Sequence, residues 1–553
     1  MLLGIDVGGT FTDAVVVGED GILAQAKVPT THGNLLAGIL AVMDEALAGL
    51  EPGALRRVAL STTIVTNTVV EGKTDPVALF LLPGPGLDLA GLIPGAPQRL
   101  TGYIDHRGRE TAAPLEEEVR EACRSSGLEL CAVAGKFAVR NPKHELAVAG
   151  WLRKYASPEH ITLGSAVSGG LNFWRRVNSA YYNAAVWRTF GRFAAAAEDA
   201  VRRRGIVAPL YILKADGGTI PLPAARELPL EAVFTGPAAS VLGVMALAAP
   251  AGEAVSLDIG GTTTDIALWR DGAPLFAERG AKVSGYPTAV RSFWLHSVGV
   301  GGDSHVRREA GEIAVGPERR GPAMAAGGPE PTVADAMIVA GLADFGDAGK
   351  AAAAMGRLAA PGQESRAVAG EVLAAAAEKI CQAIAAMIEE RAAEPVYRVE
   401  DILHGVRPQP KAVIGVGGAA AGLAPIVARK LGLDSIIPEG ATVANAIGAA
   451  LARPTLEITL RADTEQGYYT VAELGLHGRL PERRLSLADA ERIAARHLAD
   501  RAAKAGIPVT DLETVAAEEF NVVRGFSTTG KIITCRLQIK PGVTAAGREG
   551  GDW

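Results

Sequence analysis

Apolar and polar positions follow one arrangement twice along this 553-residue chain. Residues 2–7 are almost all apolar, a Gly-Gly-Thr turn follows, and a second apolar run covers residues 14–17. The same order of apolar run, glycine turn and apolar run returns at residues 257–269. Apolar runs that flank a glycine turn are typical of a β-hairpin. The repeat predicts a chain with two duplicated halves, each opening on a hairpin.

Beyond the hairpins, the pattern predicts helices and strands in alternation. Apolar residues recur at helical spacing in residues 35–50 and 238–247, and residues 351–391 form an alanine-rich helical stretch. Residues 456–553 change to alternating apolar positions around one helix, which predicts a C-terminal β-β-α-β-β module.

We therefore expect three parts in the chain. They are an N-terminal lobe at 1–180, a second lobe at 181–455 and the C-terminal module at 456–553.

The two turns carry the same chemical groups. Glycines allow backbone amides to approach an anion, and threonines add hydroxyl donors, so each turn can bind phosphate. The predicted phosphate contacts are Gly8, Gly9, Thr10, Thr12 and Asp13 in the first turn and Gly260, Gly261, Thr262, Thr264 and Asp265 in the second. One such turn alone is more often an ordinary tight turn, but a pair favours two lobes that close on one nucleotide.

Asp6 and Asp258 precede the two turns at equivalent positions. A carboxylate repels phosphate but can hold Mg²⁺, and the metal in turn binds phosphate oxygens. The sequence therefore predicts an ATP and Mg²⁺ site with these two aspartates on the metal.

Composition and charge narrow the class of protein. The chain is 48% hydrophobic and 21% charged, with a net charge of −6, so we expect neither nucleic acid nor an anionic membrane as a partner. The four cysteines form no C-x-x-C pair and no export signal is recognisable, which favours the cytoplasm. Residues 232–252 lack charge over a length that could span a bilayer, but prolines interrupt them, so a buried helix is expected there.

Several motifs occur in the order found in one protein family. They are Thr62-Thr63-x-x-x-Asn67-x-x-x-Glu71, Thr235-Gly236-Pro237-Ala238-Ala239 before the second hairpin, and Ser297-Val298-Gly299-Val300-Gly301-Gly302-Asp303-Ser304 after it. With the paired hairpins, they resemble the A subunits of the hydantoinase and 5-oxoprolinase family, which also includes ATP-dependent ketone carboxylase subunits. That family is within the actin, sugar-kinase and Hsp70 class of ATPases.

The resemblance implies an α/β fold of two duplicated actin-like (ribonuclease H-like) lobes with a cleft between them, followed by a C-terminal α+β module. It implies an enzyme that uses ATP to open a cyclic amide, such as a hydantoin or 5-oxoproline, by phosphorylating the carbonyl oxygen. It also implies a separate B-type subunit as partner, and we expect the chain to form oligomers.

The resemblance also implies roles for individual residues. The expected catalytic residues are Asp6, Asp258, Thr62, Asn67 and Asp303; the expected substrate contacts are Thr63, Gly301, Gly302 and Ser304; and the expected adenosine contacts are Gly417, Gly418 and Gly422.

Two departures from the family pattern bear on the substrate. Ser61 stands where the family commonly has His, and residues 319–328 replace a Gly-Pro-Ala-Cys-Tyr-Gly-like stretch. The predicted substrate lining has no obvious cation unless Arg175, Arg176 or Lys214 contributes one. The alternatives are a ketone carboxylase subunit, a small-molecule kinase and an ATPase that regulates a partner protein.

Overall fold

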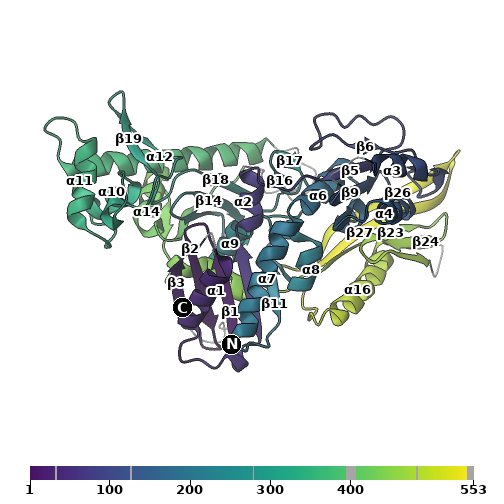
Figure 1. The fold of residues 1–553 in the computed structure, drawn as a ribbon, viewed down its shortest axis with the longest axis horizontal. Coiled ribbons are helices and arrows are strands. Elements are labelled where there is room, and N and C mark those ends of the chain that lie inside the picture. The colour runs from purple at the N-terminus through teal and green to yellow at the C-terminus, as the bar shows by residue number, and fades with distance from the viewer. Residues whose placement is uncertain (32–33, 125–127, 278, 394–406, 481–483, 545–553) are drawn as a thin grey trace.

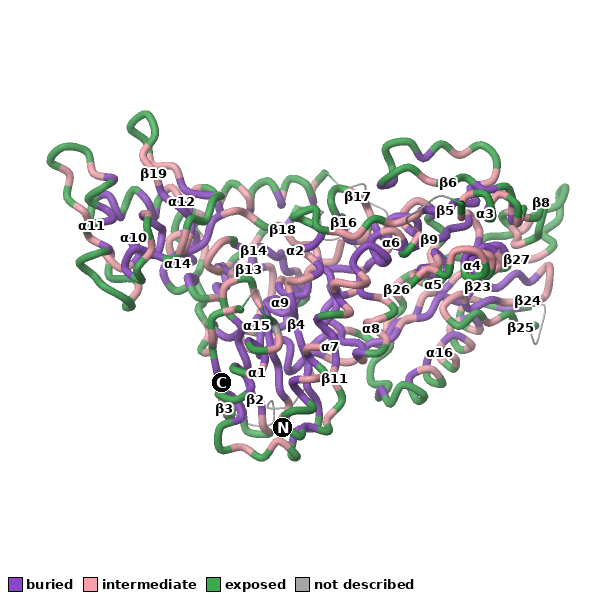
Figure 2. Tube along the Cα trace, in the orientation of Figure 1, coloured by how far each residue is buried: buried purple, intermediate pink, exposed green. Residues whose placement is uncertain are grey.

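The computed structural model of the protein describes residues 1–31, 34–124, 128–277, 279–393, 407–480 and 484–544. Figure 1 shows an elongated molecule. The strands of the first hairpin lie near its centre, helices α10 (Val333–Ala340) and α11 (Ala348–Leu358) lie at one end, and the C-terminal strands lie at the other. Figure 2 shows buried residues concentrated along the central strands and helices.

A six-stranded mixed sheet contains the first hairpin. Its order is β12 (Thr219–Pro221), β11 (Leu210–Leu213), β4 (Arg57–Thr62), β1 (Leu2–Val7), β2 (Phe11–Val17) and β3 (Ile22–Pro29). Strand β1 is antiparallel to β2 and parallel to β4. The short helices α2 (Ile64–Val70) and α8 (Leu222–Glu227) follow β4 and β12.

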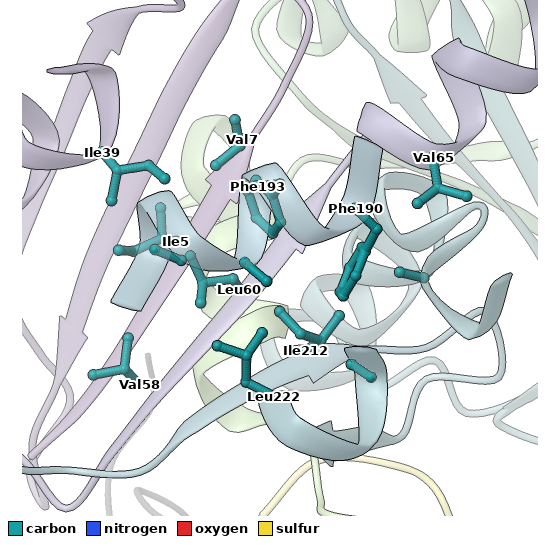
Figure 3. Close-up of a cluster of buried hydrophobic side chains, with 14 of the residues drawn as sticks. Ile5, Val7, Ile39, Val58, Leu60, Val65, Phe190, Phe193, Ile212 and Leu222 are labelled. Atoms are coloured by element: carbon teal, nitrogen blue, oxygen red, sulfur yellow. The ribbon is translucent and has the colours of Figure 1, made fainter. Parts of the chain in front are cut away.

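Helices α1 (Leu35–Ala46) and α7 (Trp187–Arg203) pack on this sheet. Figure 3 shows Phe190 and Phe193 of α7 over Ile5, Leu60 and Ile212 of the strands, and all five are buried. Each such side chain contributes about 1.5–3 kcal/mol on burial. The division at residues 180 and 181 stays a prediction, and α7, β11 and β12 beyond it lie with the first sheet.

The second hairpin lies in a sheet with the same arrangement. Its order is β15 (Ala273–Pro274), β14 (Thr264–Arg270), β13 (Ala254–Ile259), β21 (Ala412–Val416) and β22 (Asp434–Ile436), and β18 (Leu295–Val298) also pairs with β14. Strand β13 is antiparallel to β14 and parallel to β21, as β1 is to β2 and β4. The duplication predicted from the repeat is confirmed.

Helices α10, α11, α12 (Ser365–Ala392) and α14 (Ala420–Leu431) form a hydrophobic core with the second sheet. The sequence predicts one helical stretch over residues 351–391, whereas the structure has two helices, α11 and α12. Pro361 and Gly362 lie in the break, since proline lacks the amide that a continuous helix requires. Two short hairpins accompany this lobe: β16 (Lys282–Val283) with β17 (Tyr286–Pro287), and β19 (Val306–Glu309) with β20 (Glu312–Val315).

Two helices rich in small residues cross between the lobes, α9 (Thr235–Leu247) and α15 (Ala444–Leu451). A methyl group added at Gly448 would lie 2.0 Å from the carbonyl oxygen of Ala239, and one at Gly243 would lie 2.3 Å from that of Ala444. The backbones therefore touch directly, and only glycine fits at these positions. Helix α9 contains the expected buried helix, and no helix in the described part of the chain has the length and apolar character needed to cross a membrane.

A four-stranded sheet forms a separate layer near the C-terminal strands. Its order is β10 (His160–Leu163), β9 (Leu130–Gly135), β5 (Ala78–Leu82) and β6 (Gln98–Arg99). Its accompanying elements are α3 (Glu116–Ala122), α4 (Lys143–Tyr155), α5 (Gly164–Val167), α6 (Phe173–Ala185) and the hairpin of β7 (Tyr103–Ile104) and β8 (Glu110–Ala112).

The C-terminal module is a five-stranded antiparallel sheet with one helix. Its order is β25 (Leu476–Arg479), β24 (Tyr468–Val471), β23 (Glu457–Asp463), β27 (Ser527–Ile539) and β26 (Leu512–Arg524), and α16 (Leu487–Lys504) packs on it. The expected β-β-α-β-β order is therefore incomplete, because β25 precedes the helix. Its sequence, Leu-His-Gly-Arg, has too few apolar residues to indicate a strand.

Candidate functional site

The two hairpins place four aspartates in matching register. Asp6 lies opposite Asp13 across β1 and β2, and Asp258 lies opposite Asp265 across β13 and β14. Each turn is closed by a backbone hydrogen bond, from Gly8 N to the carbonyl of Phe11 at 3.1 Å and from the equivalent Gly260 N to that of Thr263 at 3.0 Å. The two turns thus repeat one geometry.

Asn445 joins the two halves. It lies in the first turn of α15, and its Nδ2 donates to Oδ2 of Asp6 at 3.3 Å and to Oδ2 of Asp258 at 3.1 Å. The duplicated carboxylates therefore face one shared site. The sequence signals this position only weakly, since Asn445 is the only polar side chain between Val443 and Ala452.

Burial disfavours the charged form of the carboxyl groups of Asp6 and Asp258. It raises the pKa of Asp6 to about 6 and that of Asp258 to about 7. Repulsion from Asp13 adds to the effect at Asp6, and repulsion from Asp265 and Asp6 adds to it at Asp258. Burial likewise raises the pKa of Asp265 to about 6. Asp13, in contrast, has a counter-ion, since Lys27 Nζ lies 2.7 Å from its Oδ1.

The two aspartates fit a divalent cation. Oδ1 of Asp6 is buried and has no hydrogen-bond partner within the described chain. Beside the other carboxylate, a methyl group at Gly417 would lie 2.4 Å from Oδ1 of Asp258, so glycine keeps this space open. Oxygen ligands and unmet negative charge suit Mg²⁺, which keeps several of its waters. No group of three or more His, Cys, Asp or Glu side chains suited to a metal occurs among the described residues.

Thr30 fixes the first turn. Its hydroxyl donates to the carbonyl of Gly8 at 2.9 Å, its amide donates to that of Thr10 at 2.9 Å, and Oγ1 of Thr12 lies 3.0 Å from its Oγ1. The hydroxyl of Thr12 is therefore held within the protein. Gly9 is exposed, and a methyl group there would meet nothing within 4 Å, which leaves the tip of this turn open.

The glycine-rich turn after β18 holds the second hairpin. Gly302 N donates to the carbonyl of Gly260 at 2.9 Å, and Asp303 N donates to that of Gly261 at 2.6 Å. Ser304 Oγ accepts from Gly301 N at 2.8 Å. Gly302 and Asp303 thus support the phosphate turn directly, and the bond between Gly301 and Ser304 closes the supporting turn. The predicted contact of Gly301, Gly302 and Ser304 with substrate stays a prediction.

The tips of the two hairpins meet. A methyl group on Gly261 would lie 3.6 Å from Oγ1 of Thr10 in the opposite lobe and 3.1 Å from Oδ2 of Asp303. The hydroxyl of Thr264, equivalent to Thr12, donates to the carbonyl of Val300 at 2.7 Å and so faces the interior. Thr10 and Asp303 therefore line the same gap as the glycines.

Asp303 has a cationic partner that the sequence did not reveal. Arg319 donates to its Oδ2 from Nε at 3.1 Å and from Nη2 at 3.0 Å. Burial raises the pKa of Asp303, and Arg319 opposes that shift. Arg319 begins the stretch that departs from the family pattern, so this departure supplies a positive charge beside the second hairpin.

The three earlier candidates for a cationic clamp lie elsewhere. Lys214 is buried and donates to Asp216 at 3.1 Å. Arg176 is buried and donates to the carbonyls of Gly135 and Lys136, and Arg175 lines a different cavity.

Thr62 and Thr63 lie at the carboxyl end of β4, next to the first hairpin. Thr63 N donates to the carbonyl of Val7 at 3.2 Å, and Asn67 Nδ2 donates to Oγ1 of Thr63 at 3.3 Å. Thr62 is buried and exchanges hydrogen bonds with Thr235. Thr63 and Asn67 are thus better placed than Thr62 to meet a ligand.

The predicted adenosine contacts divide into two kinds. Gly417 and Gly418 form the turn after β21, next to Asp258. A methyl group on Gly422, within α14, would lie 2.3 Å from Cε of Met337, so close packing against Met337 favours glycine there. Contact of all three with adenosine stays a prediction.

Comparison with known proteins gives two matches to family profiles. The profile described as "Hydantoinase/oxoprolinase" matches residues 176–458, and the one described as "Hydantoinase/oxoprolinase N-terminal region" matches residues 2–156.

Similar sequences include subunits of two enzymes. Caprolactamase subunit alpha from Pseudomonas jessenii is 26% identical over 489 residues, covering 81% of this chain and 70% of that protein. Acetophenone carboxylase gamma subunit from Aromatoleum aromaticum is 26% identical over 392 residues, covering 61% of this chain and 52% of that protein. The chain thus spans about half of the latter relative's length.

Two solved structures share the fold. The nucleotide-free structure of acetone carboxylase superposes with a TM-score of 0.72 at 17% identity, covering 99% of this chain and 88% of that chain. The ATP-dependent caprolactamase from Pseudomonas jessenii superposes with a TM-score of 0.70 at 20% identity, covering 97% and 87%.

Proposed function

The chain belongs to the hydantoinase/oxoprolinase family, and from that premise we propose that it is an ATP-dependent hydrolase that opens a small cyclic amide. The observation that carries this proposal is that the side-chain amide of Asn445 donates a hydrogen bond to both Asp6 and Asp258. Two phosphate-type turns that share one pair of carboxylates suit one nucleotide held between two lobes. The similarity to caprolactamase subunit alpha supports a cyclic amide as substrate.

We assign the residues of the site to two roles, metal binding and phosphate binding. Asp6 and Asp258 would hold Mg²⁺, and the amides of Gly8 to Thr10 and Gly260 to Thr262 would bind phosphate oxygens. Bound Mg²⁺ would neutralise negative charge on the β- and γ-phosphates. Asn445 keeps both carboxylates aimed at one point, and Gly417 keeps the space beside Asp258 free.

The reaction activates an amide, which is a poor electrophile. The γ-phosphoryl group of ATP moves to the carbonyl oxygen, so the bond from the γ-phosphorus to the ADP oxygen breaks and a new P–O bond forms. Water adds to the carbon that bears the phosphorylated oxygen, the ring C–N bond breaks, and the nitrogen leaves as an amine to give an acyl phosphate. A second water then releases phosphate and leaves a carboxylate. Thr63, Asn67 and Asp303 are the side chains we place beside the substrate.

A ketone carboxylase subunit is the second candidate function. It is favoured by the 26% identity to acetophenone carboxylase gamma subunit. Both functions begin with ATP bound between the hairpins and differ in the acceptor of the phosphoryl group.

We propose that the chain works with a B-type subunit. Both similar proteins are named as subunits. The hairpin of β26 and β27 also offers apolar surface, since Phe520, Val523 and Phe526 are exposed near its turn. Several exposed apolar side chains on one hairpin are typical of a protein–protein contact.

The test follows ADP release by the purified chain, with and without a B-type partner, with ATP and one candidate substrate at a time. Hydantoins, 5-oxoproline, lactams, small ketones with bicarbonate, sugars and polyols form the panel. We expect a cyclic amide to raise ADP release. A response to ketone and bicarbonate alone would favour the carboxylase, and a response only to a sugar or polyol would replace the hydrolase with a kinase.

A further inference from the structure

A second candidate site lies between the C-terminal sheet and the loop that joins α5 to α6. A cavity of about 270 Å³ is lined there by Gly169, Gly170 and Asn172 of the loop and by residues of β23, β24, β26 and β27. It shares Gly170 and Asn172 with a neighbouring cavity of about 900 Å³. None of these residues belongs to the hairpin site.

Arg461 of β23 lines the smaller cavity. Its side chain is only 4% exposed, and none of its three guanidinium nitrogens has a hydrogen-bond partner among the described residues. A buried, unpaired charge costs several kcal/mol. Such a cost is removed when an anion binds, and a guanidinium presents its donors in a fork that matches a carboxylate or phosphate.

No carboxylate of the described residues accepts a hydrogen bond from Arg461. Asp463, two residues along the same face of β23, accepts from Gln466 N at 3.0 Å and from Gln466 Nε2 at 3.2 Å. Oε2 of Glu473 accepts from Thr459 N at 3.0 Å, whereas its buried Oε1 has no hydrogen-bond partner within the described chain, and burial raises the pKa of this carboxyl. The described residues therefore leave the guanidinium of Arg461 without a hydrogen-bonded counter-ion, although Glu518 lines the same cavity.

Arginines dominate the walls of both cavities. The larger cavity is lined by six, Arg175, Arg176, Arg270, Arg291, Arg391 and Arg536, and Arg461 in the smaller one makes seven. The acidic residues on the same walls are Asp271 and Glu518. Arg270, Arg291 and Arg536 form ion pairs with Glu253, Glu513 and Glu457. Among the described residues of these walls, the positive charge that is free to attract an anion is therefore that of Arg461.

Neighbouring groups strengthen the positive potential at Arg461. Burial and, to a smaller extent, repulsion from Arg461 lower the pKa of Arg140 to about 10. Thr470 lies opposite Arg461 across β23 and β24, and its buried hydroxyl also has no partner within the described chain. A donor hydroxyl and a free guanidinium thus line one small cavity.

We propose that this cavity is a binding site for a small organic or inorganic anion, one that presents a carboxylate or phosphoryl group to Arg461 and Thr470. The cavity of about 270 Å³ accommodates the anionic group, and the adjoining one of about 900 Å³ leaves room for the rest of a larger molecule. The site is separate from Asp6 and Asp258 and binds its anion without Mg²⁺.

The experiment titrates the full chain with inorganic phosphate in one arm and succinate in the other, by calorimetry. The variants are Arg461→Met, Thr470→Val and, as a matched control on the same sheet, Arg479→Met, whose side chain is exposed. We expect saturable binding of at least one anion, with affinity about tenfold or more weaker in Arg461→Met and unchanged in Arg479→Met, because charge-assisted hydrogen bonds of this kind are lost. Mg-ADP should not compete.

Thr470→Val keeps the charge and the shape of the cavity, so it tests the site even if Arg461→Met does not fold. We expect about threefold to tenfold weaker binding in this variant. Equal affinities in the wild type, Arg461→Met and Thr470→Val would overturn the proposal. Absence of saturable binding of both anions to the wild type would do the same, and would leave water as the partner of Arg461.

Discussion

Nδ2 of Asn445 lies 3.1 Å from Oδ2 of Asp258, so a helix between the lobes supplies the amide that holds the second carboxylate. The same nitrogen reaches Asp6 at 3.3 Å. Because one amide donates to a carboxylate in each lobe, its loss should change the positions of both Asp6 and Asp258.

Asn445→Ala should lower substrate-dependent ADP release about tenfold, because a hydrogen bond to a charged group contributes about 1.5–3 kcal/mol. Steady-state assays at saturating ATP measure this effect. Asn521→Ala, at an exposed position of β26, is the control and should retain full activity. Equal activity of both variants would show that the carboxylates keep their positions without the amide.

Asp258→Asn should make the nucleotide-free chain more stable at about pH 8 while abolishing Mg-dependent ATP binding. The pKa of Asp258 is raised to about 7 by burial, so the charged form is disfavoured in the folded state, and its cost grows as pH rises from the ordinary value toward that pKa.

Calorimetric melting in EDTA should therefore show a Tm higher by about 1–3 °C at pH 8 and little difference near pH 3, where the carboxyl is mostly protonated in both states. A lower Tm for the variant at both pH values would contradict an electrostatic cost at this position.

Affinity for Mg-ATP should rise as pH increases from about 6 to about 8. Asp6 and Asp258, with pKa values near 6 and 7, must lose their protons before they can hold the metal. The expected gain is about tenfold per pH unit below the pKa of Asp258 and smaller above it. Titration with a fluorescent ATP analogue measures it. A wild-type affinity that does not change over this range would remove the two carboxylates from the metal site.

Gly417→Ala should reduce both stability and Mg-ATP affinity, whereas Gly418→Ala should leave the stability nearly unchanged. Gly417 has a φ of +94°, and its added methyl would lie 2.4 Å from Oδ1 of Asp258; strain of this kind costs about 1–3 kcal/mol. At Gly418 the methyl would meet nothing within 4 Å. Denaturant melts on the pair test the contrast in stability, nucleotide titrations on Gly417→Ala test its affinity, and similar losses of stability in both variants would contradict the prediction.

The repeated hairpins could be predicted from sequence because their pattern is local: each turn carries its glycines, threonines and aspartates within nine residues. The duplication also implied that the two turns meet. Asn445 gave a weaker signal, as one polar side chain in an apolar helix. Its role could not be predicted, because it depends on the position of that helix between the two lobes.

The remaining features depend on contacts between distant segments. Arg319 and Asp303 are 16 residues apart in the sequence, and the path of the chain between them, which brings them into contact, could not be predicted. Strands β11 and β12 join the first sheet more than 140 residues after β4, since backbone pairing, rather than any motif, places them there. Arg461 gave no sequence signal, because an arginine on a strand is ordinarily solvated.

Backbone contacts of α15 limit the distance between the two halves of the candidate site. Gly448 meets the carbonyl of Ala239, and Gly4 of β1 meets that of Ala446, so bare peptide groups, with no side chains between them, act as the spacer. The distance between Asp6 and Asp258 is therefore limited by the thickness of the polypeptide backbone that separates their strands. A single methyl group at either glycine would push these elements apart, and the two carboxylates that we propose as Mg²⁺ ligands would move apart with them.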